Sequence, residues 1–444
     1  MLIGTITGPG PDLAKRQIEK ANQTCDGVEL RLDLIGECSI PELLTEIQGV
    51  SILTPEKGDS SFFAYGADYL TLSWDDSIDI VHSQTKIIRS YHNFEHTPEN
   101  LEEIYEKIPH ADVVKIACTA LQTTDALRML LFAKEKENFI GISMGEDGQI
   151  TRILGPVIGN VFDFVAIEAP AAPGQMTAQD LLNIYNYRSL SKVTKIYGLI
   201  GNPISQSPSH RTHNAYFKRE GIDAVYLRML LSHKELPLFF SQAKRLKIEG
   251  LSVTIPFKEL LFEQIDHLEE AAAAIGAVNT LTFSEGMVLG ANTDAPGALD
   301  ALEEKEVVMG KRCTILGAGG TARAIGYEAH RRGAHVMILS RRISQARDVA
   351  KIVGASYGTL EDLGEYDILI NTTPTTVPIP LERLIPRKVV MEVNVSHSNS
   401  PLMVHAKSLG CSLVYGMTMF EKQAAGQFSL WFEGAKSVSS KSFR

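Results

Sequence analysis

The stretch from Cys313 to Ala324, CTILGAGGTARA, restricts the fold of this chain more than any other part of the sequence. It starts with a short apolar run, which predicts a buried parallel strand, and continues through Gly317, Gly319 and Gly320 into Ala-rich helical sequence. Glycines at such a turn let the backbone approach a pyrophosphate, which then lies at the N-terminus of the following helix. The order of the glycines departs from G-x-G-x-x-G, so the pattern by itself also fits an ordinary strand-to-helix turn.

The residues that follow this stretch favour a dinucleotide site. His335–Leu339 is predicted to be the next strand of a βαβ unit, and Ser340, Arg341 and Arg342 come directly after it. An NAD site places Asp or Glu at this position, on the ribose 2′-hydroxyl, whereas arginines suit a 2′-phosphate. The sequence therefore predicts NADP as the cofactor. The alternative is an ordinary turn with two solvated arginines.

Length, charge and cysteine usage narrow the class of protein. At roughly 100–200 residues per domain, 444 residues predict two to four domains. The net charge of −10, without a block of Lys or Arg, argues against nucleic acid or an anionic membrane as a partner. Small-molecule substrates are the partners that we expect. The five cysteines form no C-x-x-C motif and no Cys/His cluster, so we expect no metal site and no disulfide framework. The N-terminus resembles a strand rather than a signal peptide, which favours a cytoplasmic enzyme.

Short β-rich runs alternate with helical pattern over residues 1–190 and predict a (β/α)8 barrel. Two of the intervening helices are predicted at Pro98–Ile108, with Thr97 as N-cap, and at Thr124–Lys136. The eight runs are Leu2–Thr7, Gly27–Leu34, Ser51–Thr54, Tyr69–Trp74, Lys86–Tyr91, Asp112–Cys118, Phe139–Met144 and Phe164–Glu168.

Active sites of such barrels are built from polar residues at the carboxyl ends of the strands. Lys115 is conspicuous there because it interrupts an apolar strand. Burial of such a lysine would lower its pKa, and the neutral amine could then attack a carbonyl to form a Schiff base. His92, on the neighbouring strand, could transfer protons. The alternatives are a lysine paired with an acidic residue and a histidine in a turn. The other polar residues at these ends are Glu29, Arg31, Asp33, Arg152 and Gln175.

Five motifs in this order resemble type I 3-dehydroquinate dehydratase. They are ELRLD (29–33), SYHNF (90–94), VKI (114–116), SMG (143–145) with Arg152, and PGQ (173–175). The resemblance implies that Lys115 forms an imine with the C3 ketone of 3-dehydroquinate. It implies that His92 removes the C2 proton and assists loss of the C1 hydroxyl. Arg152 would bind the substrate carboxylate, and Glu29, Arg31 and Gln175 its hydroxyls.

The chain departs from that family at three places. It reads Thr54-Pro55-Glu56 where the family usually has an arginine near the end of strand 3. Ser73 stands near the end of strand 4, where the family has a glutamate, and Ala171 stands where it often has serine. The orientation of His92 is therefore expected to depend on other residues.

A second segment begins after a polar linker at residues 187–194. Lys195–Gly201 predicts a strand that leads into a loop with Ser207 and Ser209, whose hydroxyls are spaced to bind a small carboxylate. The alternative is a plain loop that caps a helix at His210–Arg219. Lys258 follows the strand-like run that Pro256 ends.

Two further strand ends, AVNTL (277–281) and GANTD (290–294), supply amide, hydroxyl and carboxylate groups. Reduction of a ketone by hydride leaves an alkoxide that needs a proton, and a Lys258 paired with Asp294 could donate it. The alternative is a surface lysine and an aspartate that caps a helix.

From about residue 195 to the C-terminus the chain resembles shikimate dehydrogenase, through the serine loop, VTIPFK, AVNT, NTD, the glycine turn, NTTP (371–374) and YGM (415–417). The resemblance implies Lys258 and Asp294 as the catalytic pair. It implies that the substrate carboxylate and hydroxyls are bound by Ser207, Ser209, Thr254, Asn279 and Gln423. It implies that NADP is held by Gly317, Ala318, Gly319, Gly320, Ser340, Arg341 and Met417.

The two resemblances together predict an α/β protein of three parts. These are a (β/α)8 barrel over 1–190, a substrate-binding domain over 195–300 completed by 418–444, and a Rossmann-like NADP domain over 301–417. The product of the first reaction, 3-dehydroshikimate, is the substrate of the second, so we expect a bifunctional enzyme of the shikimate pathway. Two alternatives remain: a dehydrogenase that oxidises quinate or shikimate with NAD, and a barrel that only binds a metabolite.

Overall fold

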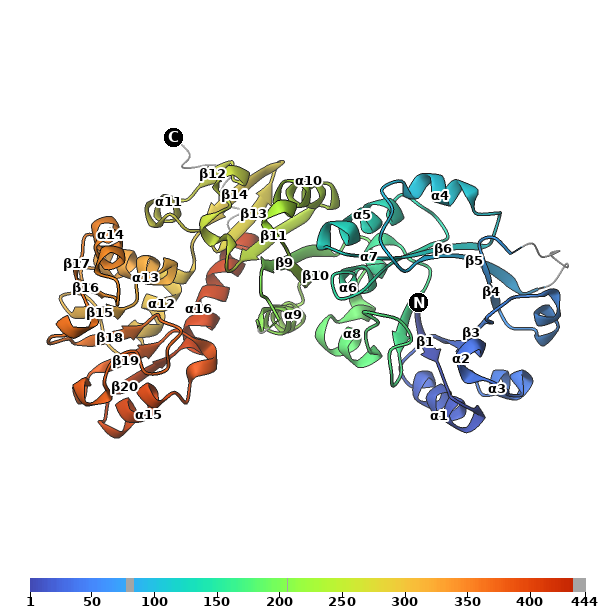
Figure 1. The fold of residues 1–444 in the computed structure, drawn as a ribbon, viewed down its shortest axis with the longest axis horizontal. Coiled ribbons are helices and arrows are strands. Elements are labelled where there is room, and N and C mark those ends of the chain that lie inside the picture. The colour runs from blue at the N-terminus through green and yellow to red at the C-terminus, as the bar shows by residue number, and fades with distance from the viewer. Residues whose placement is uncertain (77–83, 206, 434–444) are drawn as a thin grey trace. The chain divides into compact units, whose positions relative to one another are not determined.

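The computed structural model describes residues 1–76, 84–205 and 207–433. The chain divides into two compact units, Met1–Ile248 and Glu249–Arg444, which the ribbon in Figure 1 colours from blue to green and from yellow-green to red. Among the described residues, no helix is both long and apolar enough to cross a membrane.

All eight predicted strands of the first unit form, and they make one parallel sheet in the order β7-β6-β5-β4-β3-β2-β1-β8. Since side chains alternate along a strand, one residue set points inward: Ile3, Ile52, Ile88 and Ile140 fill the barrel interior. The strands are β1 (Leu2–Ile6), β2 (Gly27–Arg31), β3 (Val50–Thr54), β4 (Tyr69–Ser73), β5 (Lys86–Asn93), β6 (Val113–Thr119), β7 (Phe139–Met144) and β8 (Asp163–Ala166).

The barrel is nearly closed, and its seam lies between β7 and β8, which are the two ends of the strand order. The side chain of Asn160 spans this seam. Its Oδ1 accepts from the Gly141 amide at 3.0 Å, and its Nδ2 donates to Gly141 O at 3.3 Å and to Asp163 Oδ1 at 2.9 Å. One amide side chain therefore replaces part of a strand ladder.

The helices of the barrel follow most of the strands, and several sequence-based boundaries are corrected. The strand predicted at Gly27–Leu34 ends at Arg31 and is followed by a helix over Leu32–Ile35, and the helix predicted at Thr124–Lys136 spans Thr123–Ala133. The helix predicted at Pro98–Ile108 begins at Leu101 and is capped by Asn100, whose side chain accepts from the Glu103 amide. Thr97 instead donates to the carbonyl of Thr119 at 2.9 Å, so it links the segment before α4 to the end of β6 and does not cap the helix. The helices are α1 (Pro11–Asn22), α2 (Leu32–Ile35), α3 (Ile40–Thr45), α4 (Leu101–Lys107), α5 (Thr123–Ala133), α6 (Gln149–Ile153), α7 (Gly155–Ile158) and α8 (Ala178–Ile184).

The first unit also contains a short α/β segment after the barrel. It consists of the parallel strands β9 (Lys195–Gly201) and β10 (Ala224–Leu230) with the helices α9 (Ser209–Glu220) and α10 (Leu236–Leu246). Helix α10 contacts α5 of the barrel, where Gln242 Nε2 donates to Thr124 O at 3.1 Å.

The second unit starts with a mixed sheet in the order β11-β13-β14-β12, in which β13 is antiparallel to both neighbours. Helix α16 (Gly416–Phe428), far away in the sequence, packs against α12 (Asp294–Glu303). Beyond α16, Trp431 Nε1 donates to Leu281 O in β13 at 3.0 Å. The other elements are β11 (Ile248–Val253), β12 (His267–Leu268), α11 (Glu270–Ile275), β13 (Thr280–Ser284) and β14 (Met287–Ala291).

The rest of this unit is a parallel sheet in the order β17-β16-β15-β18-β19-β20, which is the arrangement of a Rossmann fold. Its apolar strands are buried on both faces by the flanking helices. The elements are β15 (Arg312–Leu316), α13 (Gly320–Arg331), β16 (His335–Leu339), α14 (Ile343–Val353), β17 (Ser356–Gly358), β18 (Ile368–Asn371), β19 (Val389–Glu392), α15 (Pro401–Ser408) and β20 (Ser412–Tyr415).

Candidate active sites

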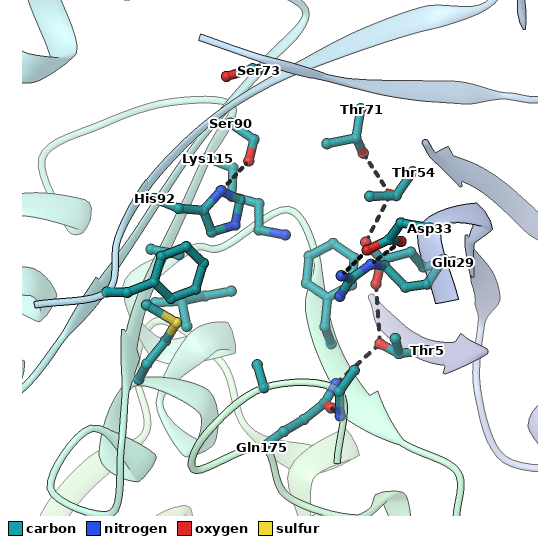
Figure 2. A pocket seen from close by; sticks show the side chains of 18 of the residues that line it. Thr5, Glu29, Asp33, Thr54, Thr71, Ser73, Ser90, His92, Lys115 and Gln175 are labelled. Atoms are coloured by element: carbon teal, nitrogen blue, oxygen red, sulfur yellow. Dashed lines mark hydrogen bonds and ion pairs between the residues drawn. The ribbon is translucent and has the colours of Figure 1, made fainter. Parts of the chain in front are cut away.

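A cavity of about 380 Å³ lies at the carboxyl ends of the barrel strands. Figure 2 shows His92 and Lys115 extending into it from the neighbouring strands β5 and β6, with Glu29 and Thr54 across the cavity. All the barrel residues predicted to act on substrate line this cavity: Glu29, Arg31, His92, Lys115, Arg152 and Gln175.

Lys115 lies in the wall of the cavity with little access to solvent. Its side chain is 9% exposed, and its Nζ atom lies 4.3 Å from the centre of the Phe164 ring. Burial lowers the pKa of Lys115, and the cations Arg31 and Arg152 lower it further, although Glu29 acts in the opposite direction. A lower pKa leaves more of the amine unprotonated and nucleophilic at neutral pH.

His92 is held by its neighbours on the inner face of β5. Its Nδ1 atom lies 3.1 Å from Ser90 Oγ, and its ring stacks on Phe94 with 5.8 Å between centroids and 8° between planes. Desolvation lowers the pKa of His92 to about 3, with added repulsion from Lys115 and Arg31. The imidazole is therefore neutral at pH 7 and can accept a proton.

The wall opposite His92 is a connected set of hydrogen bonds. Glu29 accepts from Thr5 Oγ1 at 3.2 Å and from Thr54 Oγ1 at 2.9 Å, and Gln175 Nε2 donates to Thr5 Oγ1 at 3.1 Å. Thr54 Oγ1 also lies 3.1 Å from Thr71 Oγ1, whose hydroxyl can donate to it. These bonds fix the carboxylate of Glu29 in a buried position from which it can accept hydrogen bonds from hydroxyl groups.

Two arginines of the cavity differ in what they contact. Arg31 Nε donates to Asp33 Oδ1 at 2.8 Å, and Arg31 forms an ion pair with the same carboxylate. Arg152, in α6, is 4% exposed, and its Nε is buried without a hydrogen-bond partner among the described residues. Desolvation lowers the pKa of Arg152 to about 10, so the guanidinium is still charged at pH 7. A buried cation with an unsatisfied donor is suited to bind a carboxylate.

The second unit brings the predicted lysine and aspartate together. Lys258 lies in the turn that follows β11, and its Nζ donates to Asp294 Oδ2 at 2.5 Å. Asp294 is the first residue of α12, where Asn292 Oδ1 accepts from the backbone amides of Asp294 and Ala295 at 3.1 and 3.2 Å. Asn292 thus fixes the start of the helix that presents the carboxylate.

Further predicted substrate residues are linked to the segments that carry this pair. Asn279 Nδ2 donates to Thr293 Oγ1 at 3.0 Å and to Gln423 Oε1 at 3.3 Å, so α16 contributes Gln423 to the site. Thr254 begins the turn that carries Lys258, because its carbonyl accepts from the Phe257 amide at 2.9 Å.

The two predicted serines belong to the first unit. Ser207 Oγ lies 2.8 Å from Ser209 Oγ, so both hydroxyls do point to one place. Ser209 is the first residue of α9, which runs from Ser209 to Glu220 rather than from His210 to Arg219.

The glycine turn between β15 and α13 fits a dinucleotide. Gly317 has φ +115°, and a Cβ there would meet Thr372 Oγ1 at 2.4 Å, so only glycine suits this position. A Cβ on Gly319 would have nothing within 4 Å, so the turn leaves space at the N-terminus of α13. Ala318 lies between these glycines and packs on the core of the domain.

The end of β16 supplies the residues predicted to bind a 2′-phosphate. Ser340 is buried and accepts from the Arg342 amide at 3.4 Å, whereas Arg341 and Arg342 are exposed. Neither arginine forms an ion pair with any described residue, so both guanidinium groups are available to an anion. Met417, 41% exposed, lies in the first turn of α16.

Comparison with known proteins bears on both halves of the chain. Residues 63–192 match the family model of type I 3-dehydroquinase, and residues 199–281 match that of the shikimate dehydrogenase substrate binding domain. The shikimate biosynthesis protein AroDE of Chlamydia pneumoniae is 35% identical over 97% of this chain and 95% of its own. The chloroplastic bifunctional 3-dehydroquinate dehydratase/shikimate dehydrogenase of Arabidopsis thaliana is 32% identical over 82% of this chain and 67% of its own. The chain belongs to this bifunctional family.

A solved structure matches the dehydrogenase half of this bifunctional chain. A crystal structure of a shikimate dehydrogenase in complex with NADP+ is 32% identical, with a TM-score of 0.53 over 55% of this chain and 92% of the other.

Several residues of the dehydratase cavity were not singled out from the sequence. Ser90 contacts the predicted base, Thr5 and Thr54 hold Glu29, and Glu56 lines the cavity. Three of these are small hydroxyl residues on inward-facing strand positions, where sequence pattern gives no sign of function. The described contacts of Glu29 are thus with threonines, and the described hydrogen-bond contact of His92 is with Ser90.

Proposed function

We propose that this chain dehydrates 3-dehydroquinate to 3-dehydroshikimate in its barrel and reduces that product to shikimate at Lys258 and Asp294. The observation that carries the proposal is the difference in burial and ion pairing between the two lysines. Lys115 is buried beside a neutral histidine, whereas Lys258 is ion-paired near a dinucleotide turn. Each state suits one of the two reactions of the bifunctional family.

In the barrel, the Nζ atom of Lys115 attacks the C3 ketone, and loss of water gives an imine. The imine draws electrons from C2, so His92 can take the C2 proton and leave an enamine. The enamine then expels the C1 hydroxyl, which leaves as water with the proton that His92 returns. Hydrolysis of the imine frees 3-dehydroshikimate and restores Lys115.

The remaining cavity residues hold the substrate during these steps. Arg152 binds the carboxylate, which satisfies its buried Nε. Glu29, Arg31 and Gln175 bind the ring hydroxyls, and the threonine contacts keep Glu29 in place. Ser90 orients His92 through Nδ1, so that the other ring nitrogen is directed to the substrate.

At the second site, the glycine turn would hold NADPH, which would supply the hydride for reduction of the ketone. Lys258 donates the proton that the resulting alkoxide needs, and Asp294 holds the ammonium in place. Ser207, Ser209, Thr254, Asn279 and Gln423 bind the carboxylate and hydroxyls of the substrate. Gly317, Ala318, Gly319, Gly320, Ser340, Arg341 and Met417 hold NADP, with Arg341 on the 2′-phosphate.

The same proposal includes the domain organisation and the location. Residues 1–190 form the dehydratase, residues 195–300 with 418–444 the substrate-binding domain, and residues 301–417 the NADP domain. The contacts of Gln423 with Asn279 and of Trp431 with Leu281 support the return of the C-terminal segment, of which residues 434–444 lie outside the described structure. Five free cysteines support a reducing compartment, and so the cytoplasm.

The first experiment follows oxidation of NADPH by the purified chain when 3-dehydroquinate is the only substrate. Oxidation that is lost in both Lys115→Ala and Lys258→Ala supports two sites in series. Oxidation that starts only when 3-dehydroshikimate is added would mean that the barrel binds a metabolite without converting it. Oxidation of quinate or shikimate with NAD in preference to NADP would support the other alternative.

A further inference from the structure

A carboxylate lies next to the point where the cofactor site receives a pyrophosphate. Glu259, the residue after Lys258, forms an ion pair through Oε1 with Arg323 Nη2 at 2.7 Å. A Cβ atom placed on Gly320 would come within 2.9 Å of the same oxygen. Gly320 is the first residue of α13, so the negative charge of Glu259 lies against the N-terminus of this helix.

Arg323 lies one turn further along α13 and faces the same side as Gly320. Its Nη2 also donates to Gly276 O at 3.2 Å, and its Nε is buried without a hydrogen-bond partner among the described residues. The arginine side chain is 16% exposed and that of Glu259 is 49% exposed. The cation is therefore fixed, whereas the carboxylate can rotate into solvent.

We propose that Glu259 is an internal anion of the cofactor site, which neutralises Arg323 and the N-terminus of α13 until the diphosphate of the dinucleotide displaces it. The inference rests on the proposed NADP function and adds a residue that sets the affinity for the cofactor. Two anions cannot share this helix terminus without repulsion, because each reduces the attraction available to the other.

Displacement of Glu259 leaves the catalytic lysine in place. The carbonyl of Lys258 accepts from the Val278 amide at 2.8 Å, and its Nζ is bound to Asp294. Rotation of the half-exposed Glu259 side chain breaks neither of these bonds. Loss of the carboxylate is therefore expected to change the dissociation constant of NADPH and not the rate of hydride transfer.

The test is the dissociation constant of NADPH for the whole chain, measured by isothermal titration without any substrate. Glu259→Gln is expected to bind NADPH about five- to tenfold more tightly, the fold-change that about 1–1.4 kcal/mol gives. Glu263→Gln removes the same charge from an exposed residue of the same segment and is the matched control, with unchanged affinity. Added salt is expected to reduce the gain.

Two probes separate the parts of the cofactor. Inorganic pyrophosphate is expected to bind Glu259→Gln more tightly than the unmodified chain, whereas adenosine 2′-phosphate, which has no diphosphate, binds both equally. Equal or weaker NADPH binding by Glu259→Gln would overturn the inference and leave the ion pair as a structural link only. Failure of the unmodified chain to bind NADPH would instead contradict the proposed function.

Discussion

The two proposed catalytic lysines of this chain carry the same side chain in opposite surroundings. Lys115 lies over an aromatic ring in a barrel wall, and burial lowers its pKa. Lys258 lies in a turn and donates to the carboxylate of Asp294 at 2.5 Å. A lysine without an anionic partner acts as a nucleophile, whereas a paired lysine holds a proton that it can deliver. The partner of the lysine, more than the lysine itself, decides the reaction.

The largest expected effect comes from removing the nucleophile. Lys115→Ala is expected to lower the rate of 3-dehydroquinate dehydration by about 10⁴-fold or more, since the covalent route is lost. Reduction of added 3-dehydroshikimate by NADPH is expected to stay unchanged. Intact mass after borohydride treatment with 3-dehydroquinate checks the mechanism, because only the unmodified barrel gains the mass of a reduced adduct.

Lys107→Ala, at an exposed position of α4, is the matched control and keeps the adduct. Adduct formation in Lys115→Ala would show that another amine is the nucleophile, and the contrast between the two lysines would then be lost.

Removing Lys258, the lysine paired with Asp294, is expected to affect only the reduction of 3-dehydroshikimate. Lys258→Ala should lower kcat for 3-dehydroshikimate reduction by about 10²- to 10⁴-fold, the usual contribution of a positioned acid, and leave dehydration intact. Asp294→Asn should give a smaller loss. Steady-state assays of each reaction separately make the measurement, with Lys305→Ala, exposed after α12, as control. A comparable loss of dehydration would mean that the two reactions are not independent.

Changing the cofactor site sharpens the comparison, because the barrel needs no nucleotide. Arg341→Ala is expected to weaken NADPH binding by about tenfold or more, since a charge-assisted contact to the 2′-phosphate contributes about 1.5–3 kcal/mol. NADH binding should not change. Titrations of both nucleotides give the result, and Arg347→Ala on the surface of α14 is the control. An equal loss for NADH would assign Arg341 to another part of the nucleotide.

The smallest effect is expected for the residue that orients the base. Ser90→Ala should lower kcat for dehydration by about two- to tenfold, the worth of one hydrogen bond of about 0.5–1.5 kcal/mol, without a change in KM. Ser90→Thr, which keeps the hydroxyl, should recover most of the rate. A change in KM alone would assign Ser90 to substrate binding.

A pH profile tests the contact between Ser90 and His92 by adding a negative charge at position 90 instead of removing the hydroxyl. His92, with its pKa lowered to about 3, stays neutral as the pH falls from 8 to 5. Ser90→Asp places an anion beside the imidazole and raises its pKa, so this variant should lose dehydration rate as the pH falls, over a range in which the unmodified base does not titrate. Position 90 lies opposite Lys115 in the β5–β6 register, so the rate alone cannot separate the two groups, and the ionisation of His92 is followed by the NMR signals of its ring. Equal pKa values of the His92 ring in the two proteins would contradict the contact between position 90 and His92.

The sequence predicts strands and charged groups well here, and it fails for contacts between small residues. The eight strands of the barrel could be located because each is a short apolar run bounded by turns. Lys115 was found because a charge interrupts such a run. The predicted start of α4 is wrong because Thr97 and Asn100 are both residue types that cap helices. Thr97 binds the carbonyl of Thr119, which is distant in the sequence, and Asn100 therefore caps the helix.

Contacts such as Ser90 with His92 depend on which inward-facing residues meet in space. A serine two positions before a histidine is common in any strand, so nothing in the sequence marks Ser90 as a contact of His92. Glu259 and Arg323 are separated by many residues, and their meeting at Gly320 depends on the fold of the second unit. Resemblance to a family supplies roles for residues that match it, but it says nothing of the residues that replace those it lacks.

The seam of the barrel has a consequence for how the cavity holds its substrate. Arg152 lies in α6, which follows β7, and Gln175 lies in the loop after β8, so two residues proposed to bind different groups of one substrate come from the two sides of the seam. The side chain of Asn160 links Gly141 of β7 to Asp163 of β8. The Gly145 amide, after β7, donates to Pro173 O, after β8, at 3.1 Å. A barrel in which one pair of neighbouring strands lacks a hydrogen-bond ladder is expected to open first between those two strands. Opening of the seam would be expected to change the distance between Arg152 and Gln175 without breaking any ladder between paired strands.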